Sequence, residues 1–468
     1  MTIAYKWQVF FLVALSIFMS TLDSSIVNVA LPYMMQDLGE TMGQIQWVVV
    51  IYLLTVSSLL LVFGRLSDIL GRPLVYKAGF ALFTLGSLCC ALSDGADWLV
   101  GSRAVQGVGA AMLMACSPAL VVDVFEPAQR GRGLGLVGGC VALGLTVGPL
   151  AGGLLLEYFS WRSIFYINLP VGMAALIYAD KVLRQSAKTP DVPLDVAGGV
   201  LIMIAMGGMI LALAKLPEWG VSFPTLASLG SALGAGGLWM IHARKTRNPL
   251  FDPGLFKIAG FVLPLACAML LFAALFSLVF LMPFYLSLAC GFSPARTGMI
   301  MIAPFLFLLV VSPVSGALSD RLGTKPFCLA GLACLATGLF LLGRLTPADG
   351  MLPLLGLMAL SGTGTAMFIS PNSTAIMGSV PGNLRGVASG ALATARNLGM
   401  VIGVSLSSTI FSFSFSTGGG GLDSFTPDLT PQFLSAYAHA MTAGSLLALA
   451  GFAATLARPA QEKQGGSQ

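Results

Sequence analysis

Long apolar runs of about 20 residues dominate this chain and limit the folds that it can adopt, because a helix of roughly that length crosses the hydrocarbon core of a bilayer. The chain has 468 residues, of which 56% are hydrophobic and 9% are charged, whereas a typical soluble domain is about 25% charged. A soluble core could not bury so many apolar side chains. The sequence therefore predicts an all-α polytopic membrane protein. Helices are required because lipid cannot satisfy open backbone groups, and the runs are too continuous for the strands of a β-barrel.

Fourteen candidate membrane spans follow one another along the sequence. Their approximate limits are 7–31, 46–66, 74–93, 98–122, 133–156, 162–182, 196–214, 223–242, 259–287, 297–317, 327–344, 352–377, 387–414 and 433–456. Basic residues set the orientation, because cytoplasmic segments are enriched in Lys and Arg. With the N-terminus inside, all but six of the 24 Lys and Arg residues fall in cytoplasmic segments or at their borders. Both termini are therefore predicted to lie in the cytoplasm.

The two halves of the chain carry the same short patterns at a nearly constant separation. GRLSDILGRP at 64–73 returns as GALSDRLGTK at 316–325, with six of ten positions identical, and GVGAAM at 107–112 resembles GTGTAM at 362–367. Such repetition indicates two homologous halves. The predicted organisation is an N-terminal six-helix bundle at 1–188, two inserted helices at 189–250 and a C-terminal six-helix bundle at 251–468.

Asp23 is the acidic residue that the span assignment places deep in the membrane. It follows Trp7 by 16 residues, which is about 24 Å along a helix that rises 1.5 Å per residue. A charge at that depth costs at least a few kcal/mol, so such an acid is functional by default. Burial favours the neutral form of a carboxyl group, and a nearby cation favours the charged form. We therefore expect Asp23 to bind and release protons, and the alternative is a carboxyl group that only packs between helices.

Arg103, within VGSRAVQGVGAAM, is the predicted partner of Asp23. Both residues fall in the outer half of the membrane, on the first and fourth spans, at comparable depth. The alternative is an arginine that extends to the outer interface. Gln106 lies one turn further along and can face the same cavity.

The fifth span contains GLTVGPLAGG at 144–153, a pattern that favours a gate. Gly148 and Gly152 form a GxxxG motif, so another helix can approach closely. Pro149 removes one helical hydrogen bond and permits a bend.

The loop pattern after the second span is interpreted as a conformational latch. Asp68 and Arg72 are four residues apart and can pair, and Gly64 and Gly71 allow close packing and a tight turn. In the second half, the candidate latch residues are Asp320, which matches Asp68, and the adjacent Arg321. The alternative is a solvated loop.

Aromatic and amide side chains are the candidates for a substrate cavity. They are Trp47 and Tyr52 on the second span, Phe276 in a phenylalanine stripe on the ninth and Asn372 on the twelfth. Such a stripe can equally face lipid, and Trp47 can be an interfacial anchor.

Other kinds of site have little support in the sequence. Eight cysteines without a CxxC pattern and only two histidines argue against a metal site. A GxGxxG match at 133–138 lies within a membrane span and does not follow a strand, so it does not indicate a nucleotide site. We expect neither an enzyme nor a nucleic-acid-binding protein.

Taken together, these patterns resemble the major facilitator superfamily, and within it the fourteen-span drug:proton antiporters. GRLSDILGRP is similar to the loop motif between spans two and three, RAVQGVGAAM to the fourth-span motif, GLTVGPLAGG to the antiport motif of the fifth span and LDSSIVNVALP to the first-span motif of the fourteen-span group. The resemblance implies Asp23 as proton carrier with Arg103 as its partner, and Asp68 with Arg72 as the inner latch. It also implies a bending fifth span, formed around Gly144, Gly148, Pro149 and Gly152.

Two positions depart from the pattern of these antiporters. The second-half loop reads GTKP and lacks an arginine to match Arg72, which predicts a weaker latch there. The segment ATARNLGMVIG at 393–403 holds Arg396 and no acid.

The predicted function is a proton-coupled multidrug efflux antiporter of the bacterial cytoplasmic (inner) membrane. It would export lipophilic, often cationic compounds by alternating access, driven by the proton gradient without a cofactor. Its partners would be small molecules, protons and membrane lipid, and we expect a monomer. A dedicated exporter of one metabolite or antibiotic and a lipid flippase of the same fold are the alternatives.

Overall fold

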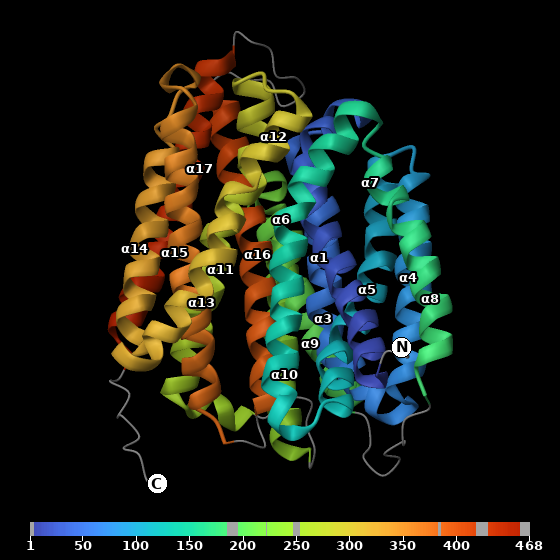
Figure 1. The fold of residues 1–468 in the computed structure, drawn as a ribbon. Coiled ribbons are helices and arrows are strands. Elements are labelled where there is room, and N and C mark those ends of the chain that lie inside the picture. Colours follow the sequence, from blue (N-terminus) through green and yellow to red (C-terminus); the bar gives the residue numbers. More distant parts are fainter. Residues whose placement is uncertain are drawn as a thin grey trace.

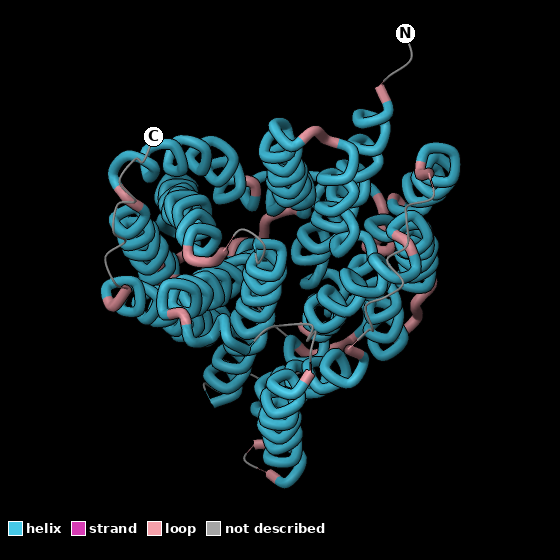
Figure 2. The backbone as a smooth tube through the Cα atoms, turned by 90° about the horizontal axis from the view of Figure 1, so that it is seen from below, coloured by secondary structure: helices cyan, strands magenta, loops and turns pink. Residues whose placement is uncertain are grey.

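The computed structural model describes residues 4–184, 195–220, 222–246, 253–381, 385–417 and 429–458. Every regular element within these ranges is a helix, and Figure 2 shows the helices gathered in two groups when viewed from below. The boundaries predicted between 188 and 189 and between 250 and 251 lie outside the described residues.

The first half of the chain forms the right-hand group of helices in Figure 1. Its elements are α1 (Tyr5–Leu38), α2 (Met42–Ile45), α3 (Trp47–Leu70), α4 (Arg72–Ala91), α5 (Ala96–Val124), η1 (Pro127–Gln129), α6 (Arg130–Tyr158), α7 (Ser163–Tyr166) and α8 (Asn168–Val182). Helix α5 packs against α1, α3 and α4, while α6 packs along α1. The helix α1 therefore lies between α5 and α6.

The second half forms the left-hand group of Figure 1. Its elements are η2 (Pro253–Lys257), α11 (Ala259–Phe284), the π-helical turn η3 (Tyr285–Ala289), α12 (Pro294–Met301), α13 (Ala303–Leu322), α14 (Thr324–Leu342), η4 (Pro347–Asp349), α15 (Met351–Gly378), α16 (Arg385–Thr417) and α17 (Thr430–Leu456). Here α11 packs on α16 and α17, and α14 packs on α15 and α17.

The two copies of the repeated pattern adopt the same local structure. Helix α3 ends at Leu70 and is followed by Gly71, whose φ is +97°, while α13 ends at Leu322 and is followed by Gly323, whose φ is +92°. Residues with a Cβ rarely adopt such angles, so glycine is needed for both turns. The predicted turn at Gly71 is therefore present, and it recurs 252 residues later in the second half.

Two predicted spans are interrupted near their beginnings, and proline accounts for both breaks. The span at 162–182 divides into α7 and α8, and the span at 297–317 divides into α12 and α13. Pro170 and Pro304 stand in the first turn of the second helix of each pair. Proline has no N–H to continue the preceding helix, but it is well suited to a first turn.

The two inserted helices, α9 (Val196–Trp219) and α10 (Phe223–Lys245), are present, but the count of fourteen spans is not confirmed. Among the described residues, twelve helices are long and apolar enough to cross a membrane, and the apolar part of α9 is Val196–Ala212. Helix α10 is rich in Gly, Ala and Ser and ends with three basic or titratable side chains, which lowers its hydropathy. Helix α9 contacts α3 and α16, one from each half, and α10 packs on α9.

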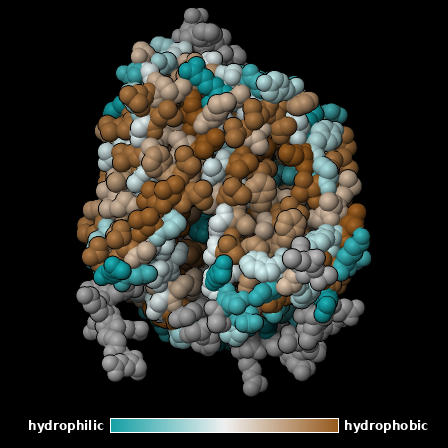
Figure 3. Space-filling view, viewed as in Figure 1, coloured by the Kyte–Doolittle hydropathy of each residue, from teal (hydrophilic) through white to brown (hydrophobic). Residues whose placement is uncertain are grey.

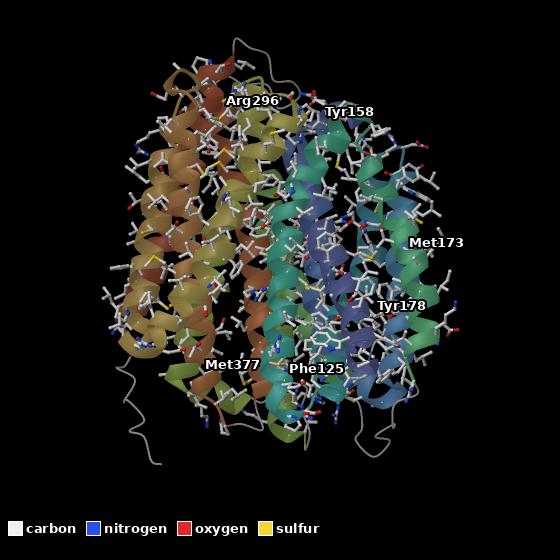
Figure 4. The ribbon with its side chains drawn as sticks, viewed as in Figure 1. Phe125, Tyr158, Met173, Tyr178, Arg296 and Met377 are labelled. Carbon is white, nitrogen blue, oxygen red and sulfur yellow. The ribbon has the colours of Figure 1, made fainter. Side chains whose placement is uncertain are left out.

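Both the beginning of α1 and the end of α17 lie at the end of the molecule drawn at the bottom of Figure 1, here called the lower end. Figure 4 shows Phe125 and Met377 near the lower end, and Tyr158 and Arg296 at the opposite, upper end. The ring of Trp7, in the first turn of α1, lies 5.6 Å from that of Phe125. Figure 3 shows a mainly hydrophobic surface between these two ends, as expected for a protein surrounded by lipid.

Candidate functional site

An ion pair between Asp23 and Arg103 forms the centre of the first half. Arg103 Nη1 lies 2.5 Å from Asp23 Oδ2, and the two side chains are 1% and 0% exposed, respectively. Asp23 lies on α1 and Arg103 on α5. The contact predicted from their comparable depth is therefore present, and it is the one ion pair in the described part of the chain with both partners fully buried.

Further polar side chains complete a closed network around this pair. Gln106 Nε2 donates to Asp23 Oδ1 at 2.8 Å, and its Oε1 accepts from Arg103 Nη1 at 2.5 Å. Asn168 Nδ2, on α8, donates to the same Oδ1 at 3.0 Å, and both amides also reach Ser87 Oγ on α4, at 2.7 and 3.3 Å. Both carboxylate oxygens of Asp23 therefore have hydrogen-bond donors.

Helix α3 supplies the remaining contacts of Arg103. Its Nε donates to the carbonyl of Val48 at 3.0 Å. Its guanidinium carbon lies 4.2 Å from the centre of the Tyr52 ring, which is within the range of a cation–π contact. The structure thus brings together four of the predicted residues, Asp23, Arg103, Gln106 and Tyr52.

Sequence reasoning missed Asn168 and Ser87. Asn168 was detectable as a lone amide in the apolar span at 162–182, two residues before a proline. Ser87 carries no comparable signal because small hydroxyl residues are scattered through the spans. Helix α4 packs closely on α5, since a Cβ at Gly86 would come within 2.6 Å of the Gln106 Cα. This packing places Ser87 beside Gln106.

The glycines of the fifth-span pattern pack α6 directly against α1. A Cβ at Gly144 would overlap Thr21 Oγ1, one at Gly148 would overlap Ser25 Oγ, and one at Gly152 would lie 2.8 Å from Ile26. Ser25 Oγ also donates to the Gly144 carbonyl at 3.2 Å. The predicted close approach of another helix is therefore present, and that helix is the one that carries Asp23.

The upper part of α6 also closes the molecule against the second half. A Cβ at Gly153 would lie 2.5 Å from the Pro294 carbonyl and 3.0 Å from Gly298 Cα, both on α12. A Cβ at Gly298 would overlap the carbonyl of Pro149. Glu157 Oε2 accepts the backbone N–H of Ala295 at 3.1 Å. These contacts bring the backbones of the two halves together at the upper end.

The lower part of α6 lacks such contacts. Added Cβ atoms at Gly131, Gly135, Gly138 and Gly139 would meet nothing within 4 Å, and the same holds for Gly64 near the lower end of α3. On the face drawn in Figure 3, hydrophilic side chains are recessed between the two halves. Close backbone contact between α6 and the second half is therefore present at the upper end and absent at these lower glycines.

The predicted latch of the first half forms, with one additional partner. Arg72 Nη2 lies 3.0 Å from Asp68 Oδ1, and Arg72 Nη1 pairs with Asp123 at the end of α5. Asp123 directly follows the predicted span at 98–122, and its sequence position does not identify a partner. Gly64 does not provide the close packing predicted for it in this conformation.

The second-half latch does not form among the described residues. Asp320 and Arg321 are exposed and make no ion pair there. Thr324 stands where the first half has Arg72, so the cation that would hold the acid is absent.

Three predicted cavity residues lie away from Asp23. Trp47 lies beside α9, with its ring 5.7 Å from Lys215 Nζ. Asn372 is buried in the second half, where it donates to the Pro264 carbonyl at 3.0 Å and accepts from Arg458 at 2.5 Å. Phe276 is buried on α11. Within the described ranges, no group of three His, Cys, Asp or Glu residues could hold a metal ion.

Comparison with known proteins identifies a family and two similar transport proteins. The family model described as Major Facilitator Superfamily matches residues 13–404. The chain is 33% identical over 417 residues to the riboflavin transporter RibZ of Clostridioides difficile (strain 630), an alignment that covers 88% of this chain and 89% of that protein. It is 34% identical over 401 residues to the multidrug resistance protein Stp of Mycobacterium tuberculosis (strain CDC 1551 / Oshkosh), with 85% and 74% covered.

A solved structure has the same fold at low sequence identity. A bacterial homolog of the human lysosomal transporter Spinster, in an inward-facing and unoccupied conformation, superposes with a TM-score of 0.68 at 13% identity, covering 97% of this chain and 98% of that one. This likeness concerns the fold alone.

Proposed function

Because the chain belongs to the major facilitator superfamily, we propose that it is a proton-coupled antiporter that exports lipophilic organic compounds. Members of this family are membrane transporters and not enzymes, as the sequence predicted. We place the chain in the bacterial cytoplasmic membrane as a monomer of fourteen spans, with the lower end in the cytoplasm. Lys6, Arg65, Arg72 and Arg130, which lie in segments at the lower end, support this orientation.

The observation that carries the proposal is the complete burial of Asp23 beside Arg103. A deep carboxylate is stable when it is ionised only while a cation and hydrogen-bond donors surround it. A proton on Asp23 makes the acid neutral while it still accepts hydrogen bonds from Gln106 and Asn168, and Arg103 then loses its counter-charge. The network therefore supports two protonation states with little rearrangement of the amides.

Exchange follows if the two protonation states prefer different openings of the molecule. With Asp23 ionised, the closed upper end leaves the space between the halves accessible from the cytoplasm, and a lipophilic compound binds there. After the halves rock and the upper end opens, a proton from outside reaches Asp23 and the compound leaves. Return to the first state delivers that proton to the cytoplasm. A single deep carboxylate gives one proton per cycle as the simplest stoichiometry.

Proton release from proteoliposomes tests the proposal. The purified chain is reconstituted with an internal pH indicator, and a panel of chemically unrelated dyes is added. Wild-type protein is expected to move protons in response to several dyes, and the Asp23→Asn variant is expected to bind dyes without moving protons. Dye-driven proton movement at the wild-type rate in the Asp23→Asn variant would refute Asp23 as the carrier.

A dedicated exporter of one metabolite is a second candidate, favoured by the relative named as a riboflavin transporter. The same panel separates the two. A response to riboflavin alone supports the dedicated exporter, and responses to several unrelated compounds support multidrug export.

A further inference from the structure

We propose that Arg396 on α16 forms an anion-binding subsite in the substrate cavity, and that the compounds carried are aromatic molecules with a negatively charged group. The proposal rests on the proposed export function and narrows its substrate class. It also reverses the preference for cationic compounds that the sequence suggested.

Arg396 is a partly buried cation without a polar partner in the described part of the chain. Its Nε is shielded from solvent and has no hydrogen-bond acceptor, and the side chain makes no ion pair. Its guanidinium carbon lies 5.3 Å from the centre of the Phe272 ring on α11, within the range of a cation–π contact. Arginine stays protonated in proteins and presents five donors. Its fork geometry fits carboxylate, sulfonate or phosphate oxygens particularly well.

The contrast with Arg103 shows what Arg396 lacks. Arg103 has a carboxylate, an amide oxygen and a backbone carbonyl within hydrogen-bond distance. A buried charge is normally compensated in this way, because desolvation is otherwise unfavourable. An arginine left uncompensated at membrane depth therefore indicates a partner that comes from outside the chain.

Arg396 lies at a depth that a compound entering from the lower end can reach. It follows Arg385, the first residue of α16, by 11 residues, which is about 16 Å along the helix. Gly399 and Gly403, one and two turns further up, press against Met269 and Ala273 of α11. Arg396 thus lies just below the point where α16 and α11 come into backbone contact, between that point and the lower end of α16.

Charge in the described spans favours an anion there. The carboxylate of Asp23 is already occupied by Arg103, Gln106 and Asn168, so it offers little attraction to a cationic compound in this conformation. Arg396 carries a positive charge that no acceptor compensates, whereas Arg458, whose Nε is also shielded, donates to Asn372. A cation close to it would be repelled, while an anion would be attracted in a medium of low dielectric constant.

The residues beside Arg396 explain the aromatic part of the proposal. Phe272 and Phe276 are one helical turn apart on α11, so they lie along the same face. Phenyl rings pack favourably on aromatic molecules. A planar anion could therefore place its ring system against these residues and its charged group on the guanidinium.

Two dyes with related ring systems but opposite charge test the subsite. Fluorescein is an anionic xanthene and rhodamine 123 a cationic one, and binding of each to the purified full chain is measured by fluorescence anisotropy without a pH gradient. Wild-type protein is expected to bind fluorescein more tightly than rhodamine 123. Loss of a charge-assisted contact should weaken fluorescein binding about tenfold to a hundredfold in Arg396→Gln, without weakening rhodamine binding.

Arg344→Gln is the matched control, because Arg344 also lies over a phenyl ring, that of Phe340, but is exposed beyond the end of α14. Its affinities for both dyes should stay at wild-type values. Arg396→Lys keeps the charge and should retain more fluorescein binding than Arg396→Gln does.

Two results would overturn the subsite. One is a wild-type chain that binds fluorescein no more tightly than rhodamine 123, a measurement that does not depend on whether a variant folds. The other is an equal loss of both dyes in Arg396→Gln, which would indicate a packing role. Since neither measurement involves proton transfer, failure here leaves the test of Asp23 in proteoliposomes independent.

Discussion

The buried pair of Asp23 and Arg103 predicts unequal consequences for removal of its two members. In Asp23→Asn, the guanidinium stays charged, because arginine cannot lose its proton in a protein. It then lies 1% exposed without a carboxylate. In Arg103→Gln, the remaining carboxyl group can take up a proton and become neutral. We therefore expect Asp23→Asn to be the more destabilising change.

The magnitudes follow from the contacts that each variant loses. Breaking a buried ion pair by removing one partner costs about 3–5 kcal/mol, and that value applies to Asp23→Asn. In Arg103→Gln, the protonated acid keeps the donors Gln106 and Asn168, and the main loss is the donor to Gln106 Oε1. An unsatisfied buried group of that kind costs about 1–3 kcal/mol. The difference between the variants is thus about 2 kcal/mol.

Unfolding of the purified variants by SDS added to dodecyl maltoside micelles at pH 5 measures these free energies. The double variant Asp23→Asn with Arg103→Gln is the control, because both charges are gone, and its cost should be smaller than the sum of the single costs. Equal destabilisation by the two single variants at pH 5 would refute the reasoning. So would additive costs in the double variant.

Three further predictions concern the closure and the network. Gly298→Val should push α12 away from α6 and widen the distance between spin labels at Tyr158 and Arg296, measured by double electron–electron resonance; an unchanged distance contradicts this. Gly64→Leu should leave the free energy of unfolding within about 0.5 kcal/mol of wild type, because nothing lies within 4 Å of the added Cβ. The same variant should slow transport in proteoliposomes, because transport requires the lower end to close. Wild-type transport rates would argue against that. Asn168→Ala removes a donor to Asp23 Oδ1 and should cost about 1–3 kcal/mol in the SDS titration, whereas a cost near zero would mean that this donor is dispensable.

The sequence predicted the helical architecture well because lipid imposes one simple rule on every span. Hydropathy alone locates helices of membrane length, and the helix rise converts residue number into depth. Depth was enough to pair Asp23 with Arg103, although they lie 80 residues apart. The same rule fails for α10, where small and polar residues lower the hydropathy of a long helix.

Contacts that depend on the three-dimensional arrangement were harder to predict. Asn168 and Asp23 are 145 residues apart, and nothing in the local sequence tells an amide which carboxylate it will meet. The same limitation applies to Asp123, which pairs with Arg72 across the loop. Asp320 shows the opposite case. The acid of the repeated pattern persists, but Thr324 replaces the arginine that would pair with it.

In the proposed mechanism, proton binding at Asp23 and closure of the upper end share one structural element, helix α1. Its residues Thr21 and Ser25 lie against the glycines of α6, while Asp23, between them in the sequence, points to α5 and α8. Because α6 and α1 are in backbone contact on one side and α6 and α12 on another, α1 cannot shift or rotate without altering the contact that closes the upper end. Protonation of Asp23 removes the attraction to Arg103 that holds α1 to α5. The glycines of the fifth span therefore provide a backbone contact between α1 and α6. Because no side chain lies between the two helices, a movement of α1 is passed on to α6.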